Sequence, residues 1–165
     1  MKIRNAIWFL VLLASSGCGY HLRGSLDSSQ ALKNIYVFGA TSALNSEILA
    51  IVKASKSSMA ASPNEASVVI KILKEDMRTR ILSIGAAGKS SESELDYYLR
   101  FQYYDNKENA LMDEQTIEMA REFFNDQTAV LAKDNEEQII RKEMYKQVAR
   151  MLIARAQIAL SNDKK

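Results

Sequence analysis

Residues 95–104 read Leu-Asp-Tyr-Tyr-Leu-Arg-Phe-Gln-Tyr-Tyr, and this stretch decides the fold of the chain. Side chains of a strand point alternately to opposite faces of a sheet. One face therefore receives only large apolar or aromatic residues, which are Leu95, Tyr97, Leu99, Phe101 and Tyr103. The other face receives a polar mixture, which is Asp96, Tyr98, Arg100, Gln102 and Tyr104. The pattern predicts a half-buried strand with a mixed outer face.

Two further strands are expected before this one. Residues 33–38 are rich in β-branched and aromatic side chains and end at Gly39. Residues 68–73 are mostly apolar, and the strand can continue to Ile84. Residues 57–66, which contain Pro63, are expected to form a loop. The segment 85–91, Gly-Ala-Ala-Gly-Lys-Ser-Ser, is expected to be a flexible turn, and Asp105 to Asn109 a hairpin loop.

Two helices are predicted from apolar residues at helical spacing. The first is capped by Thr41 or Ser42 and fades near Lys56, and its apolar face consists of Leu44, Ile48, Ile51 and Val52. The second is capped by Asp134 or Asn135, with two acidic residues in its first turn, where the helix dipole favours negative charge. Its apolar stripe consists of Ile140, Met144, Val148, Met151 and Leu152.

Residues 110–124 are ambiguous on local evidence. Their glutamates, Met119 and Ala120 favour helix by intrinsic propensity. Their position directly after a hairpin loop favours a strand that pairs with residues 95–104. Local pattern alone leaves both readings open.

The N-terminus has the pattern of a bacterial secretory signal peptide. Lys2 and Arg4 precede nine apolar residues and a small-residue zone that ends at Cys18. The apolar run is shorter than the about 20 residues that a membrane span needs. Cys18 is the only cysteine, and Ser16-Gly17-Cys18 resembles the lipobox of bacterial lipoproteins, although Ser15 stands where leucine is commonest. We therefore expect residues 1–17 to be removed and Cys18 to carry the lipid.

The expected mature chain has two segments. Residues 18–30 form a lipidated N-terminus and tether, and residues 31–165 form a single α/β domain. The 22 basic residues of the full chain include two in the signal peptide, which leaves 20 basic against 20 acidic residues. This balance gives no case for nucleic-acid binding.

The residues needed for common catalytic and metal sites are missing. His21 is the only histidine, and it lies three residues from the expected lipid anchor. One histidine and an acylated cysteine cannot make a zinc site of the usual kind, and a Ser-His-Asp triad would have to recruit His21. Residues 85–88 lack the spacing of a phosphate-binding loop. The sequence predicts a binding or structural protein with no cofactor and no metal, rather than an enzyme.

Two segments together resemble the LptE family of lipopolysaccharide-assembly lipoproteins from Gram-negative bacteria. The first is the lipidated start, Cys18-Gly19-Tyr20-His21-Leu22-Arg23-Gly24. The second, more specific segment comprises Phe123-Phe124, then Leu131-Ala132-Lys133-Asp134-Asn135-Glu136, then Lys142-Glu143-Met144-Tyr145. Length and element order match the family across the mature chain.

The resemblance implies a fold and a function. The fold is an α+β two-layer sandwich, with two helices packed on a four-stranded, mostly antiparallel sheet in the order β-α-β-β-β-α, which makes residues 110–124 a strand. The function is that of an outer-membrane lipoprotein, lipid-anchored on the periplasmic side and reaching into a barrel lumen. There it partners the LptD β-barrel as plug and assembly factor and helps deliver lipopolysaccharide to the cell surface.

Basic side chains are the expected contacts for the phosphates of lipopolysaccharide. Lys133 is the first candidate, because it lies in the matched segment just before an expected helix start. Lys89, Arg78 and Arg80 are further candidates near an expected strand-to-strand tip. Each could equally be a solvated surface cation. Two other functions stay open, namely a lipoprotein scaffold for another envelope complex and a lipid-anchored hydrolase with an unrecognised site.

Overall fold

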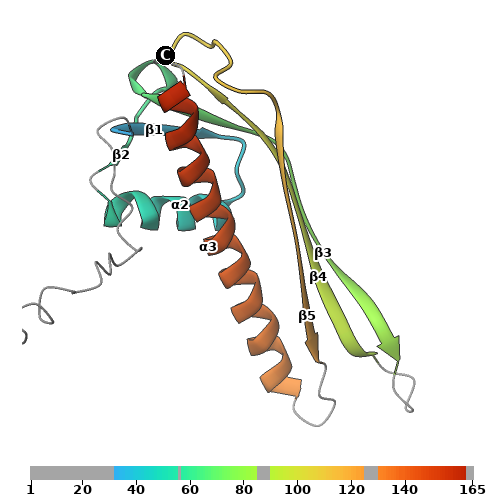
Figure 1. Ribbon diagram of the computed structural model, residues 1–165. Coiled ribbons are helices and arrows are strands. Elements are labelled where there is room, and N and C mark those ends of the chain that lie inside the picture. The colour runs from blue at the N-terminus through green and yellow to red at the C-terminus, as the bar shows by residue number, and fades with distance from the viewer. Residues whose placement is uncertain (1–31, 56, 85–89, 125–129, 163–165) are drawn as a thin grey trace, which may run out of the picture.

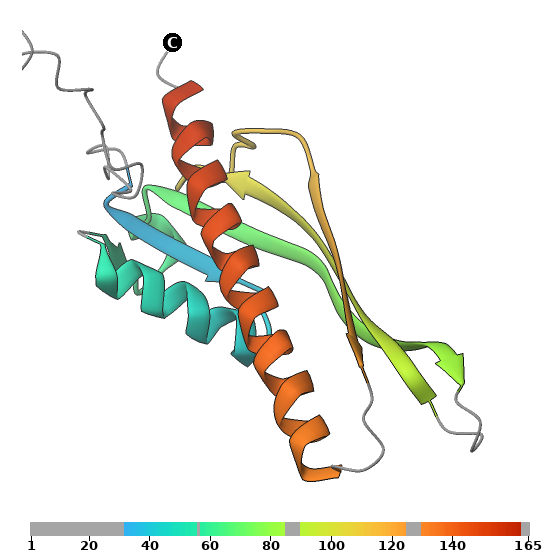
Figure 2. The same ribbon diagram turned by 60° about the horizontal axis from the view of Figure 1, so that its bottom comes forward.

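Two helices lie against one face of a five-stranded sheet (Figure 1; Figure 2). The structure is a computed structural model and describes residues 32–55, 57–84, 90–124 and 130–162. The elements in chain order are β1 (Asn34–Phe38), α2 (Ser42–Ala54), β2 (Ser58–Met59), the 3-10 turn η1 (Pro63–Glu65), β3 (Val68–Ile84), β4 (Ser90–Tyr104), β5 (Gln115–Phe124) and α3 (Val130–Asn162). The core fills the space between the helices and the sheet.

The prediction of a four-stranded, mostly antiparallel sheet was wrong. The sheet has five strands in the order β2-β1-β3-β4-β5, and β1 is parallel to both of its neighbours. α2 is the crossover that parallel pairing of β1 and β3 requires. β2 has only two residues, inside the expected loop 57–66, so it is too short to show a periodic pattern.

β4 confirms the alternation that decided the fold. Its apolar side chains at Leu95, Tyr97, Leu99, Phe101 and Tyr103 are all buried. The neighbouring strand β3 runs to Ile84, as expected, but its register with β4 shifts between Ile72 and Lys74. At this shift β3 contains one more residue than β4, as in a β-bulge. Glu75 and Met77 therefore share the inner face with Ile72.

β5 settles the ambiguity of residues 110–124 in favour of a strand over Gln115–Phe124. Ile117 pairs with Leu99 and Phe123 pairs with Ser93, and both side chains are buried. Pairing with β4 and burial of alternate residues outweigh the local helix propensity.

α3 confirms its predicted apolar stripe but begins earlier than expected. Met144, Val148 and Leu152 are buried, and Ile140 packs against the core as a partly buried residue. The helix starts at Val130, so the predicted caps Asp134 and Asn135 are helical residues and that part of the prediction was wrong. The residues that precede them, Leu131-Ala132-Lys133, are good helix formers, which explains the longer helix.

α2 is fixed to the sheet at its first turn. Thr41 caps the helix as predicted, since its Oγ1 accepts a hydrogen bond of 3.3 Å from the Leu44 N–H. The Glu75 carboxylate accepts from the Thr41 N–H at 2.9 Å and from its hydroxyl at 2.7 Å. The Tyr97 hydroxyl donates to the same carboxylate at 3.1 Å. A carboxylate at a helix N-terminus is favourable, so Glu75 ties α2 to β3 and β4.

We expect the protein to lose stability in alkaline solution. Burial raises the pKa of Tyr103 and of Tyr97 above the usual value of a phenol, about 10. Because the folded state holds these protons more tightly, the free energy of unfolding should be constant below about pH 10 and fall above it. The Tyr103 hydroxyl also donates to the Leu152 carbonyl oxygen at 2.8 Å. Tyr103→Phe should therefore cost about 1 kcal/mol near neutral pH and flatten the alkaline decline. Urea denaturation of both proteins across this range tests the point, and identical slopes would contradict it.

Candidate functional site

Two of the candidate cations, Arg78 and Arg80, lie on the outer face of β3, away from the helices. They stand opposite Asp96 and Glu94 of β4. Arg78 makes an ion pair of 2.6 Å with Asp76, and its side chain is 75% exposed. Arg80 makes an ion pair with Glu94, and its Nε lies 3.7 Å from Asp96. Both cations already have carboxylate partners on the sheet.

The two arginines differ in how firmly they are held. Glu94 is nearly buried, and its hydrogen bond and negative charge raise the pKa of Arg80, with a smaller contribution from Asp96. The two carboxylates beside Arg80 offset part of its positive charge, although its side chain is 64% exposed. Arg78 pairs with a single, more exposed partner, so Arg78 is the more available of the two.

The other two candidates are Lys89 and Lys133. Lys89 lies outside the described residues. Lys133 lies in the first turn of α3, not before it as predicted, and its side chain is likewise outside what the structure describes. The C-terminal end of β3, the N-terminal end of β4 and the start of α3 all lie at one end of the molecule (Figure 2). The backbone therefore places Lys133 at the same end of the molecule as Arg78 and Arg80.

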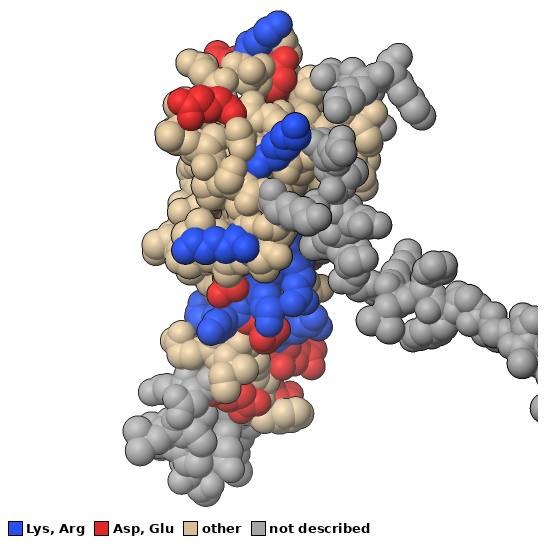
Figure 3. Space-filling model, turned by 90° about the vertical axis from the view of Figure 1, so that its left-hand side faces the viewer, with Lys and Arg blue, Asp and Glu red and all other residues tan. Residues whose placement is uncertain are grey.

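Side-chain hydrogen bonds attach the first half of α3 to this end of the sheet. The Arg141 guanidinium donates to the Thr79 hydroxyl of β3 at 3.0 Å and to Glu137 at 2.6 Å. On β5, Arg121 donates to Gln147 at 3.1 Å. Lys and Arg side chains gather across the middle of the helix-bearing side (Figure 3). The hydrogen bonds of Arg141 and Arg121 hold the first half of α3 beside the long strands β3, β4 and β5.

Large apolar side chains are exposed at the same end, which the sequence analysis missed. They are Ile81 (60% exposed), Leu82 (40%), Ile84 (68%) and Phe124 (70%). We call these four residues the apolar tip. Three of them lie within Ile81-Leu82-Ser83-Ile84, where the apolar and polar alternation of β3 breaks down, and this was the available signal. Apolar and cationic side chains together can contact an amphiphile with an anionic head.

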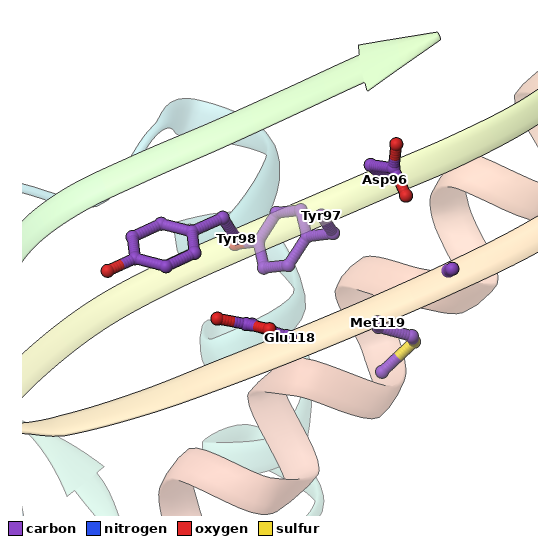
Figure 4. Close-up of a pocket in the computed structure, with 6 residues that line it drawn as sticks. Asp96, Tyr97, Tyr98, Glu118 and Met119 are labelled. Atoms are coloured by element: carbon purple, nitrogen blue, oxygen red, sulfur yellow. The ribbon is translucent and has the colours of Figure 1, made fainter. Parts of the chain in front are cut away.

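A cavity of about 470 Å³ is lined by residues of the paired strands β4 and β5 (Figure 4). It is lined by Asp96, Tyr97, Tyr98, Glu118, Met119 and Ala120. Two carboxylates and no cation face this space, so it does not suit an anionic ligand.

The described residues show neither a metal site nor a spanning helix. No group of three or more His, Cys, Asp or Glu side chains among them is placed to hold a metal ion. Within the described segments, no helix has the length and apolar character to cross a membrane.

The comparisons with known proteins agree on one family and one fold. Residues 32–156 match the family described as LptE: Lipopolysaccharide-assembly. The LPS-assembly lipoprotein LptE of Photorhabdus laumondii is 25% identical over 159 residues, covering 92% of this chain and 84% of the relative. The LPS-assembly lipoprotein LptE of Pectobacterium atrosepticum is 28% identical over 160 residues, with 92% and 85% covered.

Solved structures of lipoproteins share the fold. The rare lipoprotein B from Shewanella oneidensis superposes with a TM-score of 0.67 at 19% identity, covering 81% of this chain and all 100% of that one. The uncharacterized lipoprotein B from Nitrosomonas europaea gives a TM-score of 0.63 at 25% identity, covering 82% and 88%.

Proposed function

The chain belongs to the LptE lipopolysaccharide-assembly family, and from that premise we propose that it pairs with the LptD β-barrel of the outer membrane as plug and assembly factor and helps deliver lipopolysaccharide to the cell surface. The observation that carries this proposal is the family match, which runs from the start of β1 almost to the end of α3. As an LptE-family lipoprotein, the chain takes part in lipopolysaccharide assembly.

The surface of the domain supports the plug role. The lumen of a large outer-membrane barrel is polar, so a plug needs a polar exterior of mixed charge. The outer face of the long strands has this character, with the cations Lys71, Lys74, Arg78, Arg80 and Arg100 beside the anions Asp76, Glu94, Asp96, Glu118 and Glu122. Such a face can contact polar side chains of the barrel lumen that carry either positive or negative charge.

Affinity purification from detergent-solubilised outer membranes tests the partnership. The tagged chain should retain an outer-membrane barrel that mass spectrometry identifies as LptD, in a stable one-to-one complex. Recovery of a different envelope complex, with no barrel, would instead support the scaffold role and contradict the proposed one.

Lipidation at Cys18 is the next expectation, because the signal peptide pattern ends there and the chain holds no second cysteine. The intact mass of the membrane-extracted protein should begin at Cys18 and exceed the peptide mass by the lipid. Cys18→Ser should release the protein from the membrane, since two or more acyl chains are what makes anchoring stable. Its melting temperature should not change. A mature form that retains residues 15–17, or an unmodified Cys18, would contradict this.

Lys133 is proposed to bind a phosphate of lipopolysaccharide. It lies in the first turn of α3, where backbone N–H groups without intrahelical partners also favour anions. Lys133→Glu should weaken lipopolysaccharide binding by the purified protein more than Lys133→Ala does, because the charge is reversed. Binding should also weaken with salt, since exposed charges are screened over about 10 Å at 0.1 M ionic strength.

Lys142→Glu is the matched control, because Lys142 is an exposed lysine farther along the same helix. It should leave lipopolysaccharide binding nearly unchanged, and barrel recovery should be preserved in both variants, since a large interface seldom depends on one lysine at its rim. Equal binding by the two variants at low salt, with native melting curves, would remove Lys133 from the site. Lys89, Arg78 and Arg80 would then be tested in the same way.

A further inference from the structure

A second cavity, of about 390 Å³, lies on the outer face of the sheet at the end opposite the apolar tip. Its floor is built from two neighbouring rows of side chains that cross β1, β3 and β4. The first row is Tyr36, Val69 and Tyr104, and the second includes Phe38 and Lys71. Pro63 and the hairpin residues Asp105, Asn106 and Glu108 complete the lining.

The floor presents aromatic rings to solvent. Phe38, the last residue of β1, is 57% exposed and pairs with Lys71 of β3. Tyr104 is held in place from two sides, because the Lys71 ammonium lies 5.8 Å from its ring centroid and its hydroxyl donates to Gln102 at 2.6 Å. Exposed aromatic residues that line a hollow usually mark a binding surface.

The rim of the cavity is rigid and polar. The Asp105 carboxylate accepts hydrogen bonds of 2.8 Å from the backbone N–H groups of Lys107 and Asn109 and from the Asn109 amide. These bonds lower the pKa of Asp105 and keep it ionised. The Asn106 amide reaches the Asn64 carbonyl oxygen at 3.5 Å, which links the hairpin to η1. A rim fixed before the ligand arrives loses less entropy on binding.

Glu108 adds a second carboxylate at this rim from an unusual backbone position. Its φ of 66° lies in the left-handed region, which costs free energy for any residue other than glycine. Residues in this conformation occur in tight turns and at binding sites. Two carboxylates at one rim, against a single ammonium from Lys71, disfavour an anionic ligand.

We propose that this cavity binds a saccharide. A sugar ring has an apolar face of C–H groups, which the exposed Phe38 ring can cover. Its hydroxyl groups can donate hydrogen bonds to the carboxylates of Asp105 and Glu108. The same hydroxyl groups can accept hydrogen bonds from the Asn106 amide and the Lys71 ammonium. The lining thus matches a neutral polyol better than a phosphate or a bare acyl chain. The matching ligand can be a free glycan or the polysaccharide portion of a lipopolysaccharide, and the inference does not require the barrel.

The test is saturation-transfer NMR on the mature chain in detergent micelles. The probes are lipid-free polysaccharide released from lipopolysaccharide by mild acid, a dextran oligosaccharide, and inorganic phosphate as the anion without a sugar ring. At least one sugar should receive saturation from the protein, and inorganic phosphate should not reduce that saturation transfer. Binding by dextran would indicate a free glycan as the ligand, and binding by the released polysaccharide alone would indicate the lipopolysaccharide source.

Phe38→Ala should weaken sugar binding about tenfold, because stacking on one exposed ring is the main apolar contact. Phe124→Ala is the matched control, since Phe124 is an exposed phenylalanine of the same sheet at its other end, and it should bind sugar normally. Glu108→Gln, which removes a carboxylate acceptor without removing the ring, should also weaken binding. All three variants should melt like the parent protein.

Absence of saturation transfer to any sugar at millimolar concentration, or equal affinities of the Phe38 and Phe124 variants, would overturn the saccharide site. Binding of the released polysaccharide or of dextran that Phe38→Ala leaves unchanged would overturn it too. Recovery of the barrel with the Phe38 variant reports on the proposed partnership separately, so the two can fail independently.

Discussion

Replacing Leu152 with aspartate is expected to unfold much of the protein. Leu152 is fully buried in α3, and its backbone carbonyl accepts the hydrogen bond from Tyr103. Aspartate at this position would place a carboxylate without a partner in the apolar layer between helix and sheet. The cost of burying an unpaired polar group is about 2–7 kcal/mol and is larger for a charge, whereas whole domains are stable by about 5–15 kcal/mol.

Arg150→Ala is the control for this variant, because Arg150 lies two residues earlier on the exposed face of the same helix. Its effect should stay within about 0.5 kcal/mol, as for most surface substitutions. Urea denaturation followed by circular dichroism measures both. Similar losses in the two variants would mean that the buried face of α3 is assigned incorrectly.

Gly39→Val is expected to have the second largest effect. Gly39 has a φ of 83°, a region that residues with a side chain adopt at a cost of about 1–2 kcal/mol. A Cβ at this position would also lie 2.6 Å from the Ile72 backbone oxygen of β3. Relieving that contact requires the turn from β1 into α2 to move away from the sheet, which costs about 1–3 kcal/mol more.

Phe38→Val is the comparison for the glycine variant, because it alters the adjacent, exposed residue of β1 and keeps a good strand former. We expect it to change the free energy of unfolding by less than about 0.5 kcal/mol. A valine at position 39 that is tolerated equally well would show that the turn does not need the left-handed conformation.

Much of the fold could be predicted because its decisive segments are long and periodic. The alternation of residues 95–104 identified β4 and its buried face, and Thr41 with the apolar spacing of Leu44 and Ile48 identified α2. The strand at Gln115–Phe124 needed the family resemblance, because it forms through pairing with β4 against its own helix propensity. Strand pairing between distant segments cannot be predicted from the local sequence pattern alone.

The features that were not predicted have short or weak sequence patterns. β2 is two residues long, and the register shift after Ile72 changes which residues of β3 face the helices. The start of α3 at Val130 was missed because Asp134 and Asn135 are good capping residues that the helix places inside its first turns.

The candidate site was only partly predictable for a related reason. Arg78 and Arg80 lie where the sequence placed them, near the end of β3, but their ion pairs with Asp76 and Glu94 depend on strand register. The floor of the second cavity joins Tyr36, Val69 and Tyr104, which are about 30 residues apart in the chain and meet only through the sheet.

Photo-crosslinking from two opposite faces of the domain tests the central claim, enclosure within a barrel, most directly. A crosslinking amino acid replaces Glu118, on the outer face of β5, in one variant and Glu143, on the exposed face of α3, in another. A plug is surrounded by the barrel wall, so both positions should crosslink to the same barrel in intact outer membranes. Crosslinks to a barrel from only one face, or from neither, would contradict the account.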